Sequence, residues 1–349
     1  MDLFIPGRLC LFGEHSDWAA QYRAFNSAIA PGYAIVVGTN QGISAKVQPD
    51  DRLLFKTINA PQSLDLAMDE ILLLKTAQHN NFYSYVAGVA YEALRRYRVG
   101  GLAIDNYAMS LPLKKGLSSS AAICVLVARA FNQLYNLGLT TEAEMDLAYC
   151  GERNTSSQCG RLDQACAYGS RPILMTFEGD RLQIEPLAVG ADLYLMIVDL
   201  AGAKDTQTIL TQLNQCYPTA KNKIQADVQK YLSEINQSII KQAIEAIEQG
   251  DGAAIGKLMN LAQTNFDRYL TSACPSQLEA PILHQLLNYS SLKPYIYGGK
   301  GVGSQGDGTA QFICRDRSSR ELVISIIQTN FPRMQCYELD ISQAANKRE

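Results

Sequence analysis

The sequence feature that most constrains the fold is a run of small and polar residues directly before a long apolar helical pattern. Residues 112–122 read Pro-Leu-Lys-Lys-Gly-Leu-Ser-Ser-Ser-Ala-Ala, and apolar residues with helical spacing follow over residues 123–137. A helix that begins at these serines presents backbone N–H groups without helical partners, together with the positive end of the helix dipole. Such a helix end can bind an anion, and Gly116 would let the backbone approach a phosphate closely. The alternative is that Ser118 or Ser119 simply caps a core helix.

Length and composition predict a globular protein of about two domains. The chain has 349 residues, of which 47% are apolar and 19% charged, and one domain usually contains roughly 100–200 residues. The net charge of -3 and the lack of a basic run argue against a nucleic-acid-binding protein. No apolar stretch approaches the roughly 18 residues of a membrane span, and the N-terminus lacks the features of a signal peptide. We therefore expect a cytoplasmic protein, a monomer or homodimer, without nucleic-acid or membrane partners.

The cysteines and histidines argue against a metal cluster. The nine cysteines include no Cys-x-x-Cys pair, and the spacings of Cys150, Cys159 and Cys166 fit no common zinc pattern. The chain contains only three histidines. We expect reduced thiols that are mostly buried.

The order of the predicted elements favours an α+β fold. Helical spacing is found over residues 82–99, 123–137 and 141–153, and strand patterns over residues 9–12, 34–37, 43–47, 102–111 and 193–200. A hairpin is predicted around Gly179 and Asp180. Because strands and helices are mixed without regular βα alternation, an α+β fold is favoured over a doubly wound sheet. We place the domain boundary so that the two domains cover residues 1–190 and 191–349.

Charged residues cluster around the first predicted strand. Residues 6–17 read Pro-Gly-Arg-Leu-Cys-Leu-Phe-Gly-Glu-His-Ser-Asp, which brings Arg8, Glu14, His15 and Asp17 close together in the sequence. Carboxylates can accept hydrogen bonds from ligand hydroxyls, and an arginine can bind an anionic group or a neighbouring carboxylate. The alternative is a surface turn with a local Arg–Glu pair.

Two further clusters carry possible chemistry. Glu152 lies eleven residues before Asp163 in the segment Gly160-Arg-Leu-Asp-Gln, which could equally be a helix-end acid followed by an Asx turn. Residues 298–308 are rich in glycine and formally match the dinucleotide-binding pattern Gly-x-Gly-x-x-Gly. That pattern requires a helix at its end, whereas residues 309–314 have the pattern of a strand. A glycine loop between two strands is the better interpretation.

Together, these four segments resemble the motifs of the GHMP kinases, the family of galactokinase, homoserine kinase, mevalonate kinase and phosphomevalonate kinase. Residues 112–121 resemble the family's phosphate-binding motif, and residues 6–17 resemble the galactokinase form of its first motif. Residues 160–164 are similar to the galactokinase segment that carries the catalytic aspartate, and residues 301–308 occupy the place of the third motif. All four occur in the family's order and span most of the chain.

The resemblance implies an N-terminal domain like ribosomal protein S5 domain 2, which binds ATP, and a C-terminal ferredoxin-like domain, with ATP and substrate in the cleft between them. It also implies the roles of individual residues. The ATP phosphates would be bound by the backbone of Lys115, Gly116, Leu117, Ser118, Ser119 and Ser120. Mg²⁺ would be held by Glu152 with Ser119 or Ser120. Asp163, with Arg8 beside it, would be catalytic and face the substrate hydroxyl, and Glu14, His15 and Asp17 would bind further substrate hydroxyls.

These residue types suit phosphoryl transfer. The reaction requires mainly alignment and neutralisation of charge, which backbone donors, Mg²⁺ and one cation can supply. Asp163 could accept the proton of the substrate hydroxyl as a general base, or it could only orient that hydroxyl. Arg8 beside it would favour its ionised form.

The chain departs from galactokinases at three places. Residues 18–22 read Trp-Ala-Ala-Gln-Tyr where galactokinases usually have Asn-Gly-Gly, and residues 199–208 lack the tyrosine and arginine pair that many of them show. The third motif contains Ser304, Gln305 and Asp307 where the family tends to have glycines and other small residues. These departures leave kinase chemistry intact but leave the substrate open, because Trp18, Tyr22 or Lys204 could change the substrate pocket.

We therefore expect an ATP- and Mg²⁺-dependent kinase that phosphorylates a sugar or sugar-like polyol, with the anomeric hydroxyl as the best candidate. One alternative is a kinase for a uronic acid, inositol or mevalonate. A carboxylate substrate would need an extra cation, for which Lys204 is a candidate. The other alternative is a non-catalytic member of the family that senses sugar and ATP.

Overall fold

The computed structural model of this protein describes residues 1–58, 60, 62–79, 81–111, 116–157 and 159–343. The chain divides into two compact units, of which the first comprises Met1–Arg8 and Gly38–Ser170 and the second Leu9–Val37 and Arg171–Glu349. Two long strands, β1 (Asp2–Phe12) and β2 (Gly32–Asp50), each contribute residues to both units. The predicted boundary at residues 190 and 191 stays a prediction.

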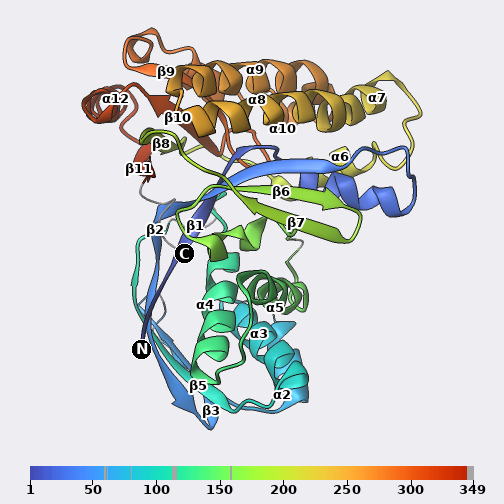
Figure 1. Cartoon of the computed structure of the whole chain (residues 1–349), viewed down its shortest axis with the longest axis vertical. Helices are drawn as coiled ribbons and strands as arrows, with labels where there is room; N and C mark the ends of the chain where they lie inside the picture. The colour runs from blue at the N-terminus through green and yellow to red at the C-terminus, as the bar shows by residue number, and fades with distance from the viewer. Residues whose placement is uncertain (59, 61, 80, 112–115, 158, 344–349) are drawn as a thin grey trace. The chain divides into compact units, whose positions relative to one another are not determined.

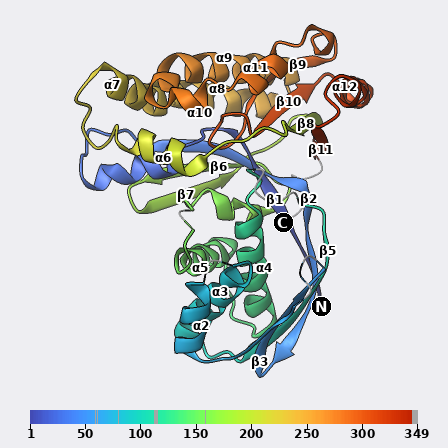
Figure 2. The same ribbon diagram turned by 180° about the vertical axis from the view of Figure 1, so that it is seen from behind.

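The first unit contains a sheet in the order β4–β3–β5–β2. β5 (Gly101–Met109) is antiparallel to residues 43–50 of β2 and parallel to β3 (Arg52–Thr57), and β4 (Leu64–Ala67) is antiparallel to β3. Four helices cover one face of this sheet, as Figures 1 and 2 show from opposite sides: α2 (Glu70–Ala77), α3 (Tyr83–Arg96), α4 (Ser119–Leu134) and α5 (Thr141–Arg153). The 3-10 helix η2 (Asp163–Tyr168) follows α5.

Helix α4 forms the core of the first unit. Its residues from Ala121 to Ala128 are all buried, and both α3 and α5 pack against it. The helix begins within the serine run, as predicted, with Ser118 as its N-cap and Ser119 and Ser120 in its first turn. It ends after Leu134, where Asn136 has a φ of 51°, in the left-handed region that commonly terminates helices.

The prediction of separate strands over residues 34–37 and 43–47 is wrong, because both belong to the single strand β2. The two glycines Gly38 and Gly42 within β2 do not form a turn. They allow the backbone of Gly169 and the side chain of Phe4 to lie close to the strand. The Gly38 N–H donates to the Gly169 carbonyl oxygen at 2.9 Å, and a Cβ atom on Gly38 would lie 2.1 Å from that oxygen. A Cβ atom on Gly42 would lie 2.4 Å from the ring of Phe4. Glycine therefore preserves the strand at both positions.

The second unit contains the first part of β2 and a hairpin. The short helices α1 (Ser16–Ala19) and η1 (Ala20–Ala24) precede β2. Residues 32–36 of β2 pair antiparallel with β6 (Ile173–Glu178), which forms a hairpin with β7 (Arg181–Pro186). The hairpin turns at Gly179, which has a φ of 60°, and this confirms the predicted hairpin.

A second sheet has the order β11–β8–β10–β9, with antiparallel neighbours throughout. Its strands are β8 (Leu193–Asp199), β9 (Ile296–Gly301), β10 (Thr309–Cys314) and β11 (Gln335–Ile341). Numbered along the chain this order is 4-1-3-2, the order of a ferredoxin-like sheet. The helices α9 (Gly252–Leu270) and α12 (Arg317–Asn330) both pack against its strands.

The remaining helices of the second unit lie mainly between β8 and β9 in the sequence. They are α6 (Thr206–Asn214), α7 (Lys223–Lys230), the π-helical turn η3 (Tyr231–Ile235), α8 (Asn236–Gln249), η4 (Thr271–Ala273), α10 (Pro275–Leu278), α11 (Pro281–Leu287) and η5 (Ser290–Leu292). α8 and α9 run side by side (Figure 1). Among the described residues, no helix combines the length and the apolar character needed to cross a membrane.

Candidate active site

Asp163 lies at the start of η2 in the first unit, where two side chains hold its carboxylate. Arg8 forms an ion pair with Asp163 Oδ1, and the Ser118 hydroxyl donates to the same oxygen at 2.5 Å. Both contacts that the described residues make with this carboxylate therefore engage Oδ1. The Arg8 side chain is only 9% exposed and that of Asp163 is 24% exposed, so the ion pair is sheltered while the carboxylate stays accessible.

Arg8 also fixes the loop before α4. Its Nη1 atom donates to the Gly116 carbonyl oxygen at 2.6 Å, and its backbone N–H donates to the Leu117 carbonyl oxygen at 3.1 Å. One arginine on β1 thus positions both the acidic side chain and the backbone that leads into α4. Lys115, which the sequence placed in the same loop, lies outside the described residues.

The first turn of α4 is formed by the serine run. Ser118 occupies the N-cap position with a φ of 55°, but its side chain makes no capping hydrogen bond. Its hydroxyl donates to Asp163 instead. The alternative that Ser118 merely caps a core helix is therefore wrong for this side chain. Ser119 and Ser120 form the next two positions of the turn, and both are half-buried.

Glu152 is a buried carboxylate near the end of α5, with 1% of its surface exposed. Gln164 Nε2 donates to its Oε2 at 2.8 Å, and the Ser157 hydroxyl donates to its Oε1 at 3.1 Å. Burial, reinforced by the negative charge of Asp163, raises the pKa of Glu152 to about 7, although hydrogen bonds from Ser120, Gln164 and Ser157 oppose the shift. A cation beside this carboxylate would stabilise its charged form.

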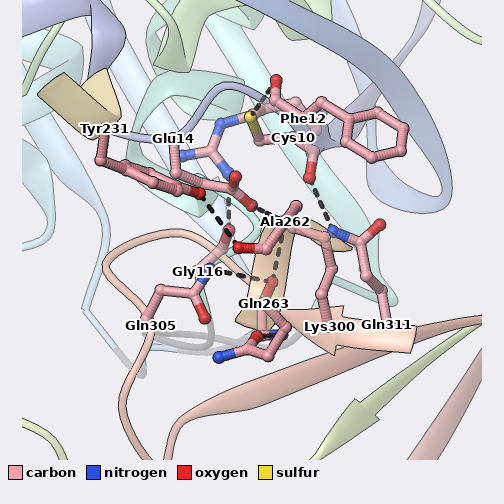
Figure 3. A network of polar contacts seen from close by, with 12 residues as sticks. Cys10, Phe12, Glu14, Gly116, Tyr231, Ala262, Gln263, Lys300, Gln305 and Gln311 are labelled. Atoms are coloured by element: carbon pink, nitrogen blue, oxygen red, sulfur yellow. Dashed lines mark hydrogen bonds and ion pairs between the residues drawn. The ribbon is translucent and has the colours of Figure 1, made fainter. Parts of the chain in front are cut away.

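Glu14 belongs to the second unit, where it lies two residues after the end of β1. Its carboxylate forms an ion pair with Lys300 of β9 (Figure 3). The side chains of Lys300 and Glu14 are only 1% and 5% exposed, and Lys300 Nζ also donates to the Gly301 carbonyl oxygen at 3.0 Å. Glu14 therefore has a buried cationic partner 286 residues away in the sequence.

His15 is a buried, neutral histidine. Burial lowers its pKa to about 3, and the positive charges of Lys204 and then Lys300 contribute, while the backbone of Ser304 acts in the opposite direction. The Trp18 indole N–H donates to His15 Nδ1 at 3.0 Å. The ring of His15 also stacks on Phe266, with a centroid distance of 6.2 Å.

Asp17 lies in α1, two residues after His15, and is buried as well. The structure thus gathers Glu14, His15 and Asp17 at the end of β1 in the second unit. The electrostatic effect of Lys204 on His15 places this lysine near the same cluster. Its side chain passes over the backbone of Gly308, where a Cβ atom would lie 2.6 Å from Lys204 Cε.

Two glutamine side chains, Gln305 in the glycine loop and Gln263 on α9, hold the backbone at Gly301, the last residue of β9 (Figure 3). Gln305 Nε2 donates to the Gly301 carbonyl oxygen at 3.3 Å, and Gln263 Oε1 accepts from the Gly301 N–H at 2.7 Å. A strand, β10, follows the loop as expected, so the formal dinucleotide-binding pattern lacks the helix that it requires.

The other two departures in this loop also have structural explanations. Asp307 Oδ1 accepts from the backbone N–H of Leu283 at 2.9 Å, in the first turn of α11. The Ser304 and Thr206 hydroxyls are hydrogen bonded at 3.1 Å, which links the loop to the start of α6. Ser304, Gln305 and Asp307 thus contact the protein itself.

The candidate site residues fall into two groups. Arg8, Ser118, Glu152 and Asp163 are brought together in the first unit, and the cluster at residues 14–17 lies in the second. Sequence reasoning missed Lys300, which is buried against Glu14. Its only signal was a lysine within a run of glycines that precedes an apolar strand.

Comparison with known proteins finds relatives of this chain. Residues 84–170 match the model of the GHMP kinases N-terminal domain. The chain is 26% identical to a galactokinase of Thermococcus kodakarensis over an alignment of 285 positions that covers 74% of this chain and 75% of the relative. It is 27% identical to a galactokinase of Haemophilus influenzae over an alignment of 293 positions that covers 74% of this chain and 71% of the relative.

Solved structures show the same fold along nearly the whole chain. A Lactococcus lactis galactokinase complexed with galactose aligns with a TM-score of 0.75 at 17% identity, covering 98% of this chain and 93% of that structure. A Methanococcus jannaschii mevalonate kinase aligns with a TM-score of 0.70 at 16% identity, covering 97% of each chain. The predicted α+β fold and the predicted family resemblance are confirmed.

Proposed function

We propose that this chain, a GHMP kinase by its N-terminal domain and its fold, is an ATP-dependent kinase that phosphorylates a hydroxyl group of a sugar. The observation that carries the proposal is the arrangement of Arg8, Ser118 and Asp163. An accessible carboxylate is hydrogen bonded directly to the N-cap of a helix whose first turn is formed by serines. A general base and an anion-binding helix end are the two protein components that phosphoryl transfer needs.

The backbone of Gly116 to Ser120 would bind the ATP phosphates, with the predicted help of Lys115. The first turn of α4 offers N–H donors and the positive end of the helix dipole to these phosphates. Because Ser118 directs its hydroxyl to Asp163, its side chain does not compete for these donors. Arg8 anchors the carbonyl oxygens of the loop, which preorganises the backbone for its ligand.

The residues around Glu152 fit a magnesium ion. Mg²⁺ prefers oxygen ligands and usually takes one or two carboxylates together with substrate phosphates. Glu152, with Ser119 or Ser120, would supply such oxygens, and the buried charge of Glu152 would gain a compensating cation. When bound, the ion neutralises charge on the phosphates during transfer.

Asp163 would accept the proton of the attacking hydroxyl through Oδ2. Within the described residues both contacts of this carboxylate go to Oδ1, which leaves Oδ2 as the oxygen for the substrate. Arg8 holds the carboxylate in place and stabilises its negative charge. The oxygen of the substrate then forms the new bond to the γ-phosphorus as the bond to ADP breaks.

Glu14, His15 and Asp17 would bind the hydroxyls of the acceptor. Carboxylates accept hydrogen bonds from sugar hydroxyls, and a neutral histidine can donate one. The anomeric hydroxyl is our candidate for the phosphorylated group, by analogy with the galactokinases that this chain resembles. A uronic acid is an alternative acceptor, because the positive charge of Lys204 near the cluster could bind its carboxylate. The nine free cysteines suit a reducing compartment, and we propose the cytoplasm.

Replacement of the catalytic carboxylate tests the proposal. Asp163→Asn should lower kcat by about 10²–10⁴-fold while the affinity for ATP changes little, because the amide keeps the size of the side chain but cannot accept the proton. Asp105→Asn, on an exposed position of β5, is the matched control and should leave kcat unchanged. ADP release would be measured over a panel of neutral sugars, uronic acids, polyols and mevalonate. An unchanged kcat in Asp163→Asn would contradict the proposed role.

The alternative of a sugar and ATP sensor predicts a different result. A sensor would bind ATP and one panel member in calorimetry but release no ADP above the ATP-only rate. Glu14→Ala and Asp17→Ala distinguish binding roles from structural ones. Each substitution should lower the affinity for the acceptor far more than the affinity for ATP. Equal losses for both ligands would indicate a structural role for these two carboxylates.

A further inference from the structure

Trp18 makes a directional contact with His15 that fixes where the histidine carries its proton. An indole N–H can only donate, so the 3.0 Å contact from Trp18 Nε1 requires a lone pair on His15 Nδ1. A neutral imidazole with a lone pair at Nδ1 has its proton at Nε2. The lowered pKa of His15 means that the ring stays neutral at ordinary pH.

The same histidine is held rigidly from several sides. Its ring stacks on Phe266 with an interplanar angle of 27°, and Trp18 approaches it edge-on at a centroid distance of 5.8 Å. Trp18 in turn packs edge-to-face on Tyr217 at 5.5 Å. The backbone of His15 is itself in the left-handed region, with a φ of 70°, a conformation that non-glycine residues adopt rarely and that often marks functional positions.

The opposite nitrogen of the ring, Nε2, lacks a well-formed hydrogen bond to the described residues. His15 Nε2 is buried and makes no hydrogen bond of normal length and angle with the residues that the structure describes, so the Ser304 backbone, which acts on the pKa of the ring, engages it only weakly. Buried N–H groups are rarely left without a well-formed hydrogen bond, and a ligand or water usually completes it. His15 lies between Glu14 and the buried Asp17, in the segment proposed to bind the acceptor.

We infer that Trp18 is a positioning residue that fixes His15 as an Nε2–H donor, so that the acceptor substrate must present an oxygen lone pair to this nitrogen. The inference rests on the proposed function. It narrows the substrate to one with an accepting oxygen at that point, such as a sugar hydroxyl or a carboxylate. An analogue without that oxygen would leave the buried Nε2–H without a well-formed hydrogen bond, and the site should bind this analogue less tightly.

The position of the proton can be measured directly by nitrogen NMR of protein labelled at its histidine side chains. The chain has only three histidines, so the signals of His15 can be assigned by comparison with His79→Gln and His284→Gln. The wild-type protein should show a protonated Nε2 and an unprotonated Nδ1 for His15. Trp18→Phe keeps an aromatic ring but removes the donor, and it should give a mixture of both tautomers. Tyr217→Phe is the control and should leave the wild-type pattern.

Kinetics provide the second measurement. Trp18→Phe should raise the KM of the accepted sugar about two- to tenfold, as expected for the weakening of one hydrogen bond, with the KM of ATP unchanged. Among monodeoxy analogues of that sugar, one should bind much less tightly than the parent to the wild-type protein. In Trp18→Phe, the difference in affinity between the parent sugar and this one analogue should be smaller, because the proton of His15 is no longer fixed at Nε2. The differences for the other analogues should stay as in the wild-type protein.

Binding can be followed without turnover because Trp18 is the only tryptophan in the chain. Its fluorescence should change when the acceptor binds to the wild-type protein in the absence of ATP. An Nδ1–H tautomer in the wild-type protein, or an unchanged Nε2–H tautomer in Trp18→Phe, would overturn the inference. If the wild-type protein phosphorylates no panel member, the proposed function fails instead, and the NMR result still decides the tautomer.

Discussion

The buried ion pair between Glu14 and Lys300 allows a quantitative test of the second unit. Lys300→Met removes the ammonium group but keeps most of the aliphatic stem, so little packing is lost. The Glu14 side chain, which is 5% exposed, then loses its cationic partner in a buried environment. Removing one member of a buried pair usually lowers the free energy of unfolding by about 3–5 kcal/mol.

This loss can be converted into a melting temperature. Unfolding entropy is about 2.1 cal/mol/K per residue, which gives roughly 0.7 kcal/mol/K if the 349 residues melt together. Lys300→Met should therefore melt about 4–7 °C below the wild-type protein in differential scanning calorimetry. Lys223→Met is a matched control in the same unit, because Lys223 pairs with Asp227 at 2.5 Å on α7 and its side chain is 85% exposed. It should shift the melting temperature by less than about 1 °C.

The double variant Glu14→Gln/Lys300→Met separates pairing from packing. Removal of both charges leaves no uncompensated ion. The double variant should therefore melt at a higher temperature than the sum of the losses in Glu14→Gln and Lys300→Met predicts. Strict additivity of the losses, or a Lys300→Met protein as stable as the Lys223→Met control, would refute the assignment of a strong buried pair.

Three further predictions address other parts of the molecule. Glu152→Gln should raise the Mg²⁺ concentration needed for half-maximal activity at least about tenfold, with an unchanged acceptor KM; activity titrations at fixed ATP would show an unshifted midpoint if Glu152 only packs. The pKa of His15 is lowered to about 3 in the folded protein, so below roughly pH 6.5 this side chain binds a proton in the unfolded chain but not in the folded one. The free energy of unfolding should therefore fall by up to about 1.4 kcal/mol per pH unit below that pH. Urea titrations between pH 7 and 5 should show a shallower decline in His15→Gln, and parallel curves would contradict this. Gly256→Ala should lower the unfolding free energy by about 1–3 kcal/mol, because its Cβ would lie 2.5 Å from the backbone of Tyr297; an unchanged thermal melt would show that α9 and β9 can move apart.

Sequence patterns correctly predict the helices and strands that are specified by residues close together in the chain. The serine run and the apolar spacing predict α4, and the Gly179 turn between two alternating segments predicts the β6–β7 hairpin. The same reasoning fails for β2, because Gly38 and Gly42 look like turn residues in sequence. Their actual cause is the close approach of Gly169 and Phe4, which no local pattern contains.

Sequence patterns could not predict contacts between residues that are far apart in the chain. Arg8 and Asp163 are 155 residues apart, and only the resemblance to a family placed them together. Lys300 is 286 residues from Glu14, and a lysine among glycines is typical of an exposed turn. The tautomer of His15 likewise depends on the orientation of Trp18, which helical spacing does not specify.

The sharing of β1 and β2 between the two units has a consequence for synthesis on the ribosome. Leu9–Val37 belongs with Arg171–Glu349, so Gly38–Ser170 is translated before the partners of that early segment exist. At 5–20 residues per second this interval lasts on the order of ten seconds. The apolar residues Ala34, Ile35 and Val36 lack their strand partner β6 during that time, which makes the nascent segment a natural client for a holding chaperone. A fragment that starts at Arg171 would lack this segment altogether and would be an incomplete unit.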